Sequence, residues 1–345
     1  LANVAAVPLA TCAFTLAFLL IFLPYTVFHE AISWMIQGVL WISRQSYGML
    51  TIGHVPFLWV LLFYFMTGLW IWKKNGQNRH IRISLAYVIM IILIWIPMAR
   101  RKSLAFLDVG QGDCFVADTK SGAIIFDGGS SSEDQVGRYR ILPYMKYLGY
   151  QKIQIAVISH MDIDHYSGIK ELLEMGKIKY LGLPEIPKDE TMKKIIGIAK
   201  KRGTTIFYLS RGRQITTKDG SLKVLHPQKN SQMEKNAASL VMQGKILGYR
   251  VLLTGDVEKE GEEELLSEEL ERADILKAAH HGSKNSTSNE FLQKVQPKQT
   301  VISCGKQNRY GHPHLETIHR LQTYRTKIYR TDRSGAIIFF KRRDG

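Results

Sequence analysis

The chain has 345 residues, of which 46% are hydrophobic, and a formal net charge of +16 at pH 7. This length is too great for one ordinary domain, and the hydrophobic residues are concentrated in the first hundred positions. The composition therefore excludes a single small soluble domain and predicts an apolar part followed by a basic part.

Three apolar, nearly uncharged runs occupy the first part of the chain, at residues 4–23, 55–72 and 83–98. Each run is close to the roughly 20 residues that a helix needs to cross a hydrocarbon core. Tryptophans near the run ends fit the aromatic belts of membrane interfaces. We predict a membrane region over residues 1–101 with about three transmembrane helices, and a buried helix of a soluble protein is the alternative for the shortest run.

Two segments between these runs carry further information. Residues 27–42 space their apolar side chains with a helical period, which predicts an interfacial or partner-packing helix. The loop 73–82 holds most of the Lys and Arg of the first hundred residues, so the positive-inside rule predicts that it is cytoplasmic and that the chain after residue 98 lies outside. The basic residues Arg100, Arg101 and Lys102 favour the opposite orientation unless they bind phosphate.

Residues 102–345 alternate between strand-like and helix-like segments. Strand composition is found at residues 104–109, 123–126, 155–159, 205–209, 222–225, 239–242, 250–253, 275–278, 300–303 and 336–340. Helical patterns cover residues 139–148, 169–175, 192–201, 258–270 and 315–324. This alternation is what a core of two sheet layers faced with helices requires.

The segment Ser159-His160-Met161-Asp162-Ile163-Asp164-His165 places two imidazoles and two carboxylates directly after an apolar strand. Alternate side chains at a strand end can face different cations, so His160 and Asp162 can bind one ion while Asp164 and His165 bind another. Imidazole and carboxylate are ligands of Zn²⁺ and Mn²⁺. A solvated acidic turn with two incidental histidines is the alternative.

Two later strand ends carry further candidate ligands. Asp256 ends the apolar segment 249–256, where a carboxylate can bridge two cations roughly 3.5–4 Å apart. His280 and His281 follow the apolar segment that begins at Leu276. Taken alone, Asp256 is equally well read as a helix N-cap, and the histidines as a polar turn.

The order of these motifs resembles the metallo-β-lactamase superfamily, which has an αββα sandwich with one or two metals at the sheet edges. The motifs are Phe126-Asp127-Gly128-Gly129, His-x-Asp-x-Asp-His at 160–165, Thr254-Gly255-Asp256 and His280-His281-Gly282-Ser283. Residues 102–345 also resemble the C-terminal part of the ComEC family of bacterial competence channels, which internalise DNA. Three more motifs carry this resemblance: Leu107–Asp113, Asn236-x-x-Ser239-Leu240-Val241 and Asn308-x-Tyr310-Gly311-His312-Pro313.

This resemblance implies a role for each candidate residue. The metal ligands would be His160, Asp162, Asp164, His165, Asp256, His280 and His281. Asp164 and Asp256 would be the catalytic carboxylates of a site that cleaves phosphodiester bonds through a metal-activated hydroxide. Asp113, Asp127 and His312 would lie behind the ligands and orient them, although Asp127 alternatively stabilises only the Gly128-Gly129 turn.

The chain departs from the superfamily at one ligand position. The commonest loop reads His-x-His-x-Asp-His, and Asp162 stands in place of the second histidine. The harder oxygen ligand shifts the preference from Zn²⁺ toward Mn²⁺, so we expect one or two divalent ions, Mn or Zn. His226 is the only histidine between the first loop and Asp256, and we predict that it is a strand-end residue outside the site.

The basic charge points to a polyanionic substrate. The region up to Ala99 contains five basic residues and one acidic residue, which leaves about +12 for the remainder. Such a surface attracts DNA through its phosphates, and Tyr310 can stack on a base of a single strand. The predicted DNA-binding residues are Lys277, Ser283, Lys284, Ser286, Asn308, Arg309 and Tyr310; a solvated surface charge is the alternative for each lysine taken singly.

The apolar runs predict a multi-pass cell-membrane protein. The resemblance implies that its hydrolase domain degrades the non-transported DNA strand on the extracytoplasmic face. Its expected partners are single-stranded DNA, membrane lipid and other competence proteins. The remainder of a channel domain is a further expected partner, because the chain starts at Leu1 and reads as a piece of a longer protein. A hydrolase of small esters or lactones and a non-catalytic DNA-guiding module are the alternatives. Cys114 and Cys304 form either a disulfide or two buried free thiols.

Overall fold

The computed structural model describes residues 29–44, 53–54, 57, 59–62, 64–65, 84, 88 and 101–342. The chain divides into two compact units, Leu1–Thr51 and Ile52–Gly345. The predicted span 4–23 and the basic loop 73–82 lie outside the described residues, as do most positions of the other two predicted spans. Among the residues that are described, no helix is both long enough and apolar enough to cross a bilayer.

The first unit contains one described helix, α2 (His29–Arg44), which confirms the helical period of residues 27–42. Trp34 and Trp41 are 75% and 64% exposed. They are seven positions apart and therefore share one face of the helix. The role of this face as an interfacial surface remains a prediction.

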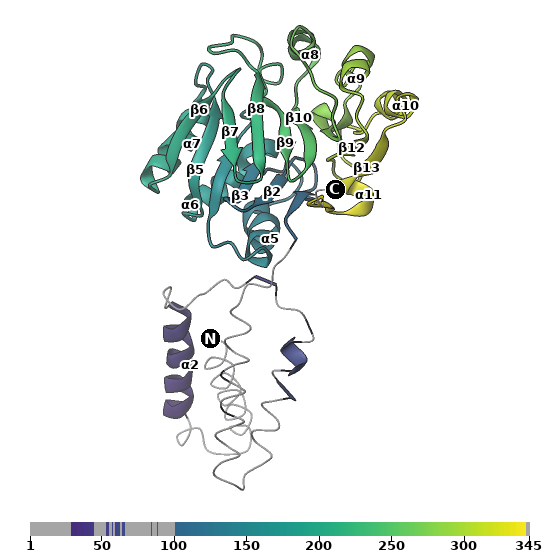
Figure 1. Cartoon of the computed structure of the whole chain (residues 1–345). Coiled ribbons are helices and arrows are strands. Elements are labelled where there is room, and N and C mark those ends of the chain that lie inside the picture. Colours follow the sequence, from purple (N-terminus) through teal and green to yellow (C-terminus); the bar gives the residue numbers. More distant parts are fainter. Residues whose placement is uncertain are drawn as a thin grey trace. The chain divides into compact units, whose positions relative to one another are not determined.

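The second unit is built on two seven-stranded sheets (Figure 1). In spatial order, the first sheet contains β14 (Ile337–Phe340), β1 (Ser103–Phe106), β2 (Phe115–Thr119), β3 (Gly122–Phe126), β4 (Ile153–Val157), β5 (Ile178–Pro184) and β6 (Thr205–Leu209). Pairing is antiparallel from β14 to β3 and parallel from β3 to β6.

The second sheet follows the same plan. In spatial order it contains β13 (Lys327–Arg330), β12 (Gln299–Ile302), β11 (Ile275–Lys277), β10 (Tyr249–Leu253), β9 (Val241–Ile246), β8 (Gly220–His226) and β7 (Gln214–Thr217). Pairing is parallel from β13 to β10 and antiparallel from β10 to β7.

Helices cover the outer face of each sheet (Figure 1). On the first sheet these are η3 (Gly137–Ile141), α5 (Leu142–Tyr147), α6 (Ile163–Glu174) and α7 (Glu190–Lys201). On the second they are α8 (Lys259–Leu266), α9 (Asn289–Val295) and α10 (Leu315–Thr323), while η4 (Ala279–Gly282) and α11 (Thr331–Ser334) are short connecting turns.

The strand periodicity explains this layering. Along β1, Leu104 and Phe106 enter the core between the sheets, whereas Ala105 enters the core under the helices. Because side chains alternate between the two faces of a strand, a sheet buried on both faces is apolar at every position. The αββα sandwich predicted from the sequence is therefore the observed arrangement.

Candidate metal centre

Loops that follow strands of both sheets meet at one place. Asp127 follows β3, His165 comes shortly after β4, Asp256 comes shortly after β10 and His281 follows β11, while Asp113 precedes β2. The carboxyl ends of adjacent parallel strands lie at one edge of a sheet. The parallel halves of the two sheets therefore bring Asp127, His165, Asp256 and His281 to a common site. Asp113 reaches the same edge because β2 is antiparallel to β3 and begins where β3 ends.

Glycines allow the loops to pack closely there. A Cβ atom on Gly112 would lie 2.3 Å from the carbonyl oxygen of Gly129, and a Cβ atom on Gly129 would lie 2.5 Å from that of Ile163. The amide of Gly129 donates to the Asp113 carbonyl over 3.1 Å. Because only glycine tolerates such approaches, the three segments form one packed unit that holds Asp113 beside His165.

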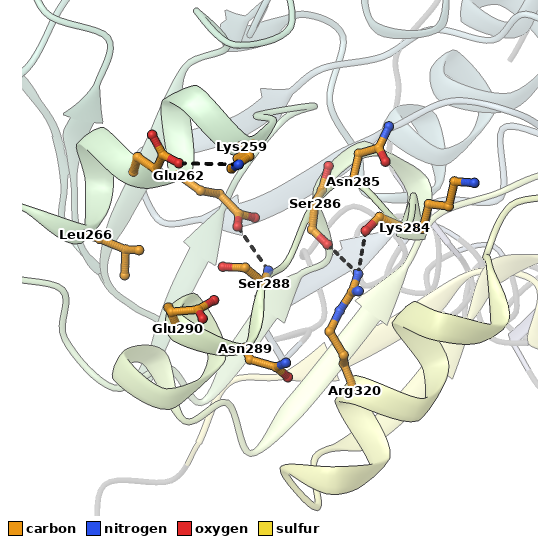
Figure 2. Close-up of a pocket in the computed structure, with 11 residues that line it drawn as sticks. Lys259, Glu262, Leu266, Lys284, Asn285, Ser286, Ser288, Asn289, Glu290 and Arg320 are labelled. Atoms are coloured by element: carbon orange, nitrogen blue, oxygen red, sulfur yellow. Dashed lines mark hydrogen bonds and ion pairs between the residues drawn. The ribbon is translucent and has the colours of Figure 1, made fainter.

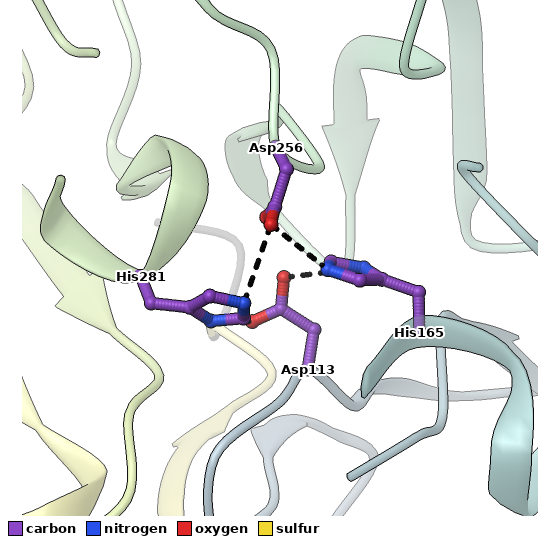
Figure 3. A group of neighbouring side chains, drawn as sticks. All are labelled: Asp113, His165, Asp256 and His281. Carbon is purple, nitrogen blue, oxygen red and sulfur yellow. Dashed lines mark ion pairs between the residues drawn. The ribbon is translucent and has the colours of Figure 1, made fainter. Parts of the chain in front are cut away.

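Four buried residues, Asp113, His165, Asp256 and His281, place one potential ligand atom each within 4.8 Å of one another (Figure 3). Oδ2 of Asp256 lies 3.2 Å from Nε2 of His165 and 3.3 Å from Nε2 of His281. Two imidazole nitrogens and a carboxylate oxygen thus converge on one point. Imidazole and carboxylate are the donors that Zn²⁺ and Mn²⁺ accept.

The orientation of both imidazoles fits a metal at that point. Nδ1 of His165 lies 3.0 Å from Oδ2 of Asp127, and Nδ1 of His281 lies 2.9 Å from the carbonyl oxygen of Ser303. Such partners fix Nδ1 as the protonated nitrogen and leave Nε2 as a ligand atom. Within residues 101–342, the buried atoms without a hydrogen-bond partner include Nε2 of both histidines and Oδ1 of Asp256.

Asp127 therefore does more than stabilise the Gly128-Gly129 turn. It is fully buried, its backbone φ is 57°, and its Oδ1 accepts a 2.7 Å hydrogen bond from the amide of Ser159. Its other oxygen faces His165. One carboxylate thus ties the end of β4 to the imidazole.

The remaining predicted ligands surround this group without belonging to it. Oδ2 of Asp164 lies 3.4 Å from Nε2 of His281, and Nε2 of His280 lies 3.8 Å from Oδ2 of Asp256. Nε2 of His160 lies 3.4 Å from Oδ2 of Asp162. The four-residue group combines His165 with Asp113, whereas the sequence led us to expect that Asp164 and His165 bind one ion. That pairing of ligands stays a prediction.

The first ligand motif is only partly a loop. Asp162 occupies the N-cap position of α6, and Asp164 and His165 lie in its first turn. The Asp162 side chain makes no capping bond and pairs instead with His160 and Lys235. The hydrogen bond from His160 and the ion pair with Lys235 hold the pKa of Asp162 below its usual value although burial opposes the shift.

The two histidines of η4 have unusual backbone conformations. His280 has φ 46° and His281 has φ 53°, so two consecutive residues other than glycine adopt the left-handed region. Such conformations cost free energy and are concentrated at functional sites. They direct the His281 ring into the group and leave the His280 ring near Asp256 and Glu258.

Lys277 corrects one sequence-based assignment. We predicted that it binds DNA, but it is 4% exposed and its ammonium pairs with Asp113, lies 3.5 Å from Oδ1 of Asp256 and donates to the Gly255 carbonyl over 2.9 Å. A side chain enclosed in this way cannot contact a phosphate backbone. Lys277 is an internal component of the site.

The charges at the site perturb one another strongly. Burial raises the pKa of Asp113, but Lys277 and His281 outweigh it and lower the value to about 2. Burial lowers the pKa of His165, but the carboxylates of Asp256 and Asp127 raise it well above the ordinary value, and Asp256 with Asp113 does the same for His281. The buried carboxylates and imidazoles therefore favour each other's charged forms.

A cavity of about 290 Å³ opens above the group. Its lining is mostly polar and consists of Gln111, Asp162, Ile163, Asp164, Asp256, His280, His281, Tyr310 and His312. The His312 ring stacks on Tyr310 with centroids 5.7 Å apart. Burial and the neighbouring histidines lower the pKa of His312 to about 4, so it is neutral at the mouth of the cavity.

The other predicted DNA contacts divide into exposed and enclosed residues. Tyr310 is 43% exposed, and Arg309 lies over its ring at 4.9 Å. The Asn308 amide is used by its own loop, donating to the carbonyls of Gly305 and His312 and accepting from the His312 amide. Asn308 thus shapes its own loop, and its role in DNA binding stays a prediction.

The loop after η4 gives a similar correction. Ser283 and Ser286 are buried, whereas Lys284 is exposed. Arg320 holds this loop by donating to the carbonyls of Lys284 and Ser286, beside a cavity of about 470 Å³ (Figure 2). Of the predicted contacts on this loop, only Lys284 can reach a bound polymer.

Three further predictions concern His226, the two cysteines and Asp113. His226 is buried and its Nε2 lies 2.7 Å from the Ala237 carbonyl, so its exclusion from the site agrees with the structure. Cys114 and Cys304 are buried free thiols rather than a disulfide. Asp113 was expected behind the ligands, and the motif Gly112-Asp113 gave no signal that its carboxylate would join them.

Comparisons with known proteins identify the family of the chain. Residues 107–306 match the model of the metallo-beta-lactamase superfamily. The chain is 34% identical over 294 residues to ComE operon protein 3 of Bacillus subtilis (strain 168), covering 79% of this chain and 38% of that protein. It is 30% identical over 248 residues to Competence protein ComA of Neisseria gonorrhoeae, covering 69% of this chain and 32% of that protein.

A third relative, Recombination protein 2 of Haemophilus influenzae, is 27% identical over 268 residues, covering 76% of this chain and 32% of that protein. The chain therefore spans about a third of the length of these curated relatives. Since the family match covers more than half of its residues, the chain belongs to the metallo-β-lactamase superfamily, and the relatives that it resembles include competence proteins.

Proposed function

We propose that the chain is a metal-dependent nuclease of a bacterial DNA-uptake system, which hydrolyses phosphodiester bonds of the strand that does not enter the cell. The observation that carries this proposal is the convergence of Asp113, His165, Asp256 and His281 in one buried group, two members of which, Asp256 and His281, line an open cavity. A divalent ion held there would polarise a phosphoryl oxygen and lower the pKa of a water molecule.

The residues of the chain then divide the work. His165, His281 and Asp256 would bind the ion, with Asp164 at the rim of the group. Asp127 and the Ser303 carbonyl would keep both imidazoles in the ligand tautomer. Because these side chains are already fixed in place, they would need little rearrangement when negative charge develops at the phosphoryl group.

The lining of the cavity differs from that of a pocket for a small apolar ester or lactone. A small apolar substrate requires a mainly hydrophobic pocket, whereas most residues around this cavity are polar or charged. The exposed Tyr310 ring with Arg309 above it supplies the aromatic and cationic surface on which single-stranded bases stack. The positive net charge supports the same substrate.

The cellular setting is proposed from the sequence and its relatives. The apolar runs 4–23, 55–72 and 83–98 would anchor residues 1–101 in the cell membrane, and residues 102–345 would form the hydrolase domain on the extracytoplasmic face. Similarity to a protein named as a competence protein supports DNA and other competence proteins as partners. A channel portion absent from this chain would complete the assembly.

A substrate comparison tests the proposal. The full chain, purified in detergent, is incubated with labelled single-stranded DNA, labelled double-stranded DNA and a chromogenic lactone, each with Mn²⁺, Zn²⁺ or a chelator. We expect metal-dependent cleavage of DNA and little turnover of the lactone. Lactone hydrolysis with intact DNA would favour the esterase alternative, and metal-dependent DNA binding without cleavage would favour a guiding module.

A further inference from the structure

The ammonium of Lys277 lies 3.5 Å from Oδ1 of Asp256, an oxygen that a bridged pair of metal ions would need for its second ion. We propose that Lys277 is a fixed internal cation, and that the group of Asp113, His165, Asp256 and His281 consequently holds one metal ion rather than two. This inference rests on the proposed function only in assuming that the group binds metal.

The two oxygens of Asp256 face different partners. Oδ2 lies 3.2 Å from Nε2 of His165 and 3.3 Å from Nε2 of His281. Oδ1 lies 3.5 Å from Nζ of Lys277. A carboxylate that bridges two metals must offer one oxygen to each ion. Here the imidazoles converge on one oxygen only, and the ammonium occupies the side of the other.

Lys277 is fixed in this position by its surroundings. The ammonium donates a hydrogen bond to the Gly255 carbonyl and forms ion pairs with the carboxylates of Asp113 and Asp256. Its side chain is 5% exposed and extends from the end of β11, so it cannot swing into solvent without moving the strand. Displacement would also leave two carboxylates without their buried partner.

Electrostatic repulsion by the Lys277 ammonium also disfavours a second metal ion. The ammonium already offsets part of the negative charge of Asp113 and Asp256, and it would repel a second divalent ion placed within a few ångströms. Burial strengthens that repulsion because little water screens it. One divalent ion on the imidazole side would meet Oδ2 of Asp256, whereas the ion pair of Lys277 is with Oδ1.

Mn²⁺ electron paramagnetic resonance distinguishes the two arrangements. Two Mn²⁺ ions bridged roughly 3.5–4 Å apart give an exchange-coupled spectrum, whereas a single ion gives the six-line spectrum of isolated Mn²⁺. The full chain is loaded with increasing Mn²⁺ in detergent, as wild type, Lys277→Met and Lys306→Met. Lys306 is an exposed lysine just after β12, and its variant controls for loss of one positive charge.

We expect wild type and Lys306→Met to show only isolated Mn²⁺, and Lys277→Met to bind one further equivalent and develop the coupled spectrum. A coupled spectrum in the wild type would overturn the inference while leaving a metal-dependent hydrolase intact. Isolated Mn²⁺ in a Lys277→Met variant that melts cooperatively would also overturn it. Failure of the wild type to bind Mn²⁺ or Zn²⁺ would instead defeat the proposed function, and the wild-type spectrum decides if Lys277→Met does not fold.

Discussion

Replacing Asp127 by Asn should weaken metal binding although Asp127 is not itself in the group of four. The Asp127 carboxylate accepts one hydrogen bond from the Ser159 amide over 2.7 Å and faces Nδ1 of His165 over 3.0 Å. An asparagine has only one oxygen, so it can satisfy one of these two N–H groups. If its NH₂ group faces His165, the imidazole moves its proton to Nε2 and loses its ligand atom.

The expected loss follows from this geometry. Partners that orient a metal ligand contribute about 10–100-fold to metal affinity or activity, which corresponds to about 1.4–2.7 kcal/mol. Because Asp127 is fully buried, solvent cannot replace the lost acceptor, and the upper half of this range applies. Competitive titration of Mn²⁺ against a chromogenic chelator measures the affinity directly.

Asp274→Asn is a matched control for this variant. Asp274 is also a buried aspartate that accepts an amide hydrogen bond, from Arg250 over 3.0 Å, and it pairs with Lys298 rather than with a histidine. Its variant should lower the melting temperature and leave the Mn²⁺ affinity unchanged. Equal Mn²⁺ affinities for Asp127→Asn and wild type would refute the orienting role of Asp127.

Three other outcomes are expected. Asp256→Ala should abolish metal-dependent cleavage and lower the Mn²⁺ content, because it removes the oxygen on which both imidazoles converge; elemental analysis at wild-type occupancy would contradict this ligand assignment. The pKa values of His165 and His281 are raised, so a metal must displace protons from both imidazoles. Mn²⁺ affinity should therefore fall as the pH decreases, starting above the ordinary histidine pKa of about 6.5. Isothermal titration in buffers of different ionisation enthalpy should show proton release on Mn²⁺ binding, and its absence would refute the argument. Combined neutralisation of Lys284 and Arg309 should raise KM for single-stranded DNA, flatten the log–log salt dependence of binding by up to about two units and leave kcat near its original value, and an unchanged salt slope would remove the charge argument for DNA.

The sequence predicted the sandwich and most of the ligands because both depend on local patterns. Short continuous apolar runs mark the strands, and polar residues after strands mark the site edge. His165, Asp256 and His281 were predicted from their positions at strand ends, and all three lie in the observed group. The start of α6 was placed at residue 169 instead of Ile163, since the polar motif in its first turn obscures the helical period.

Tertiary contacts account for what the sequence did not reveal. Lys277 reads as a basic residue near a ligand loop, and only the folded structure brings Asp113 from the first sheet against it. Asp113 joins the ligands because Gly112 and Gly129 allow their loops to touch, a contact that no local pattern encodes. Ser286 was read as a DNA contact from its residue type alone, but its side chain is buried in the folded structure.

The central claim is that the buried group of Asp113, His165, Asp256 and His281 is the metal centre at which DNA is hydrolysed. The most direct test measures, in one Mn²⁺ titration of the full chain, both the bound metal and the initial rate of cleavage of labelled single-stranded DNA. We predict that the rate rises in proportion to occupancy in the wild type, and that Asp256→Ala lacks both the tight site and the cleavage. Cleavage by Asp256→Ala at the wild-type rate, or full metal occupancy of the wild type without any DNA cleavage, would contradict the account.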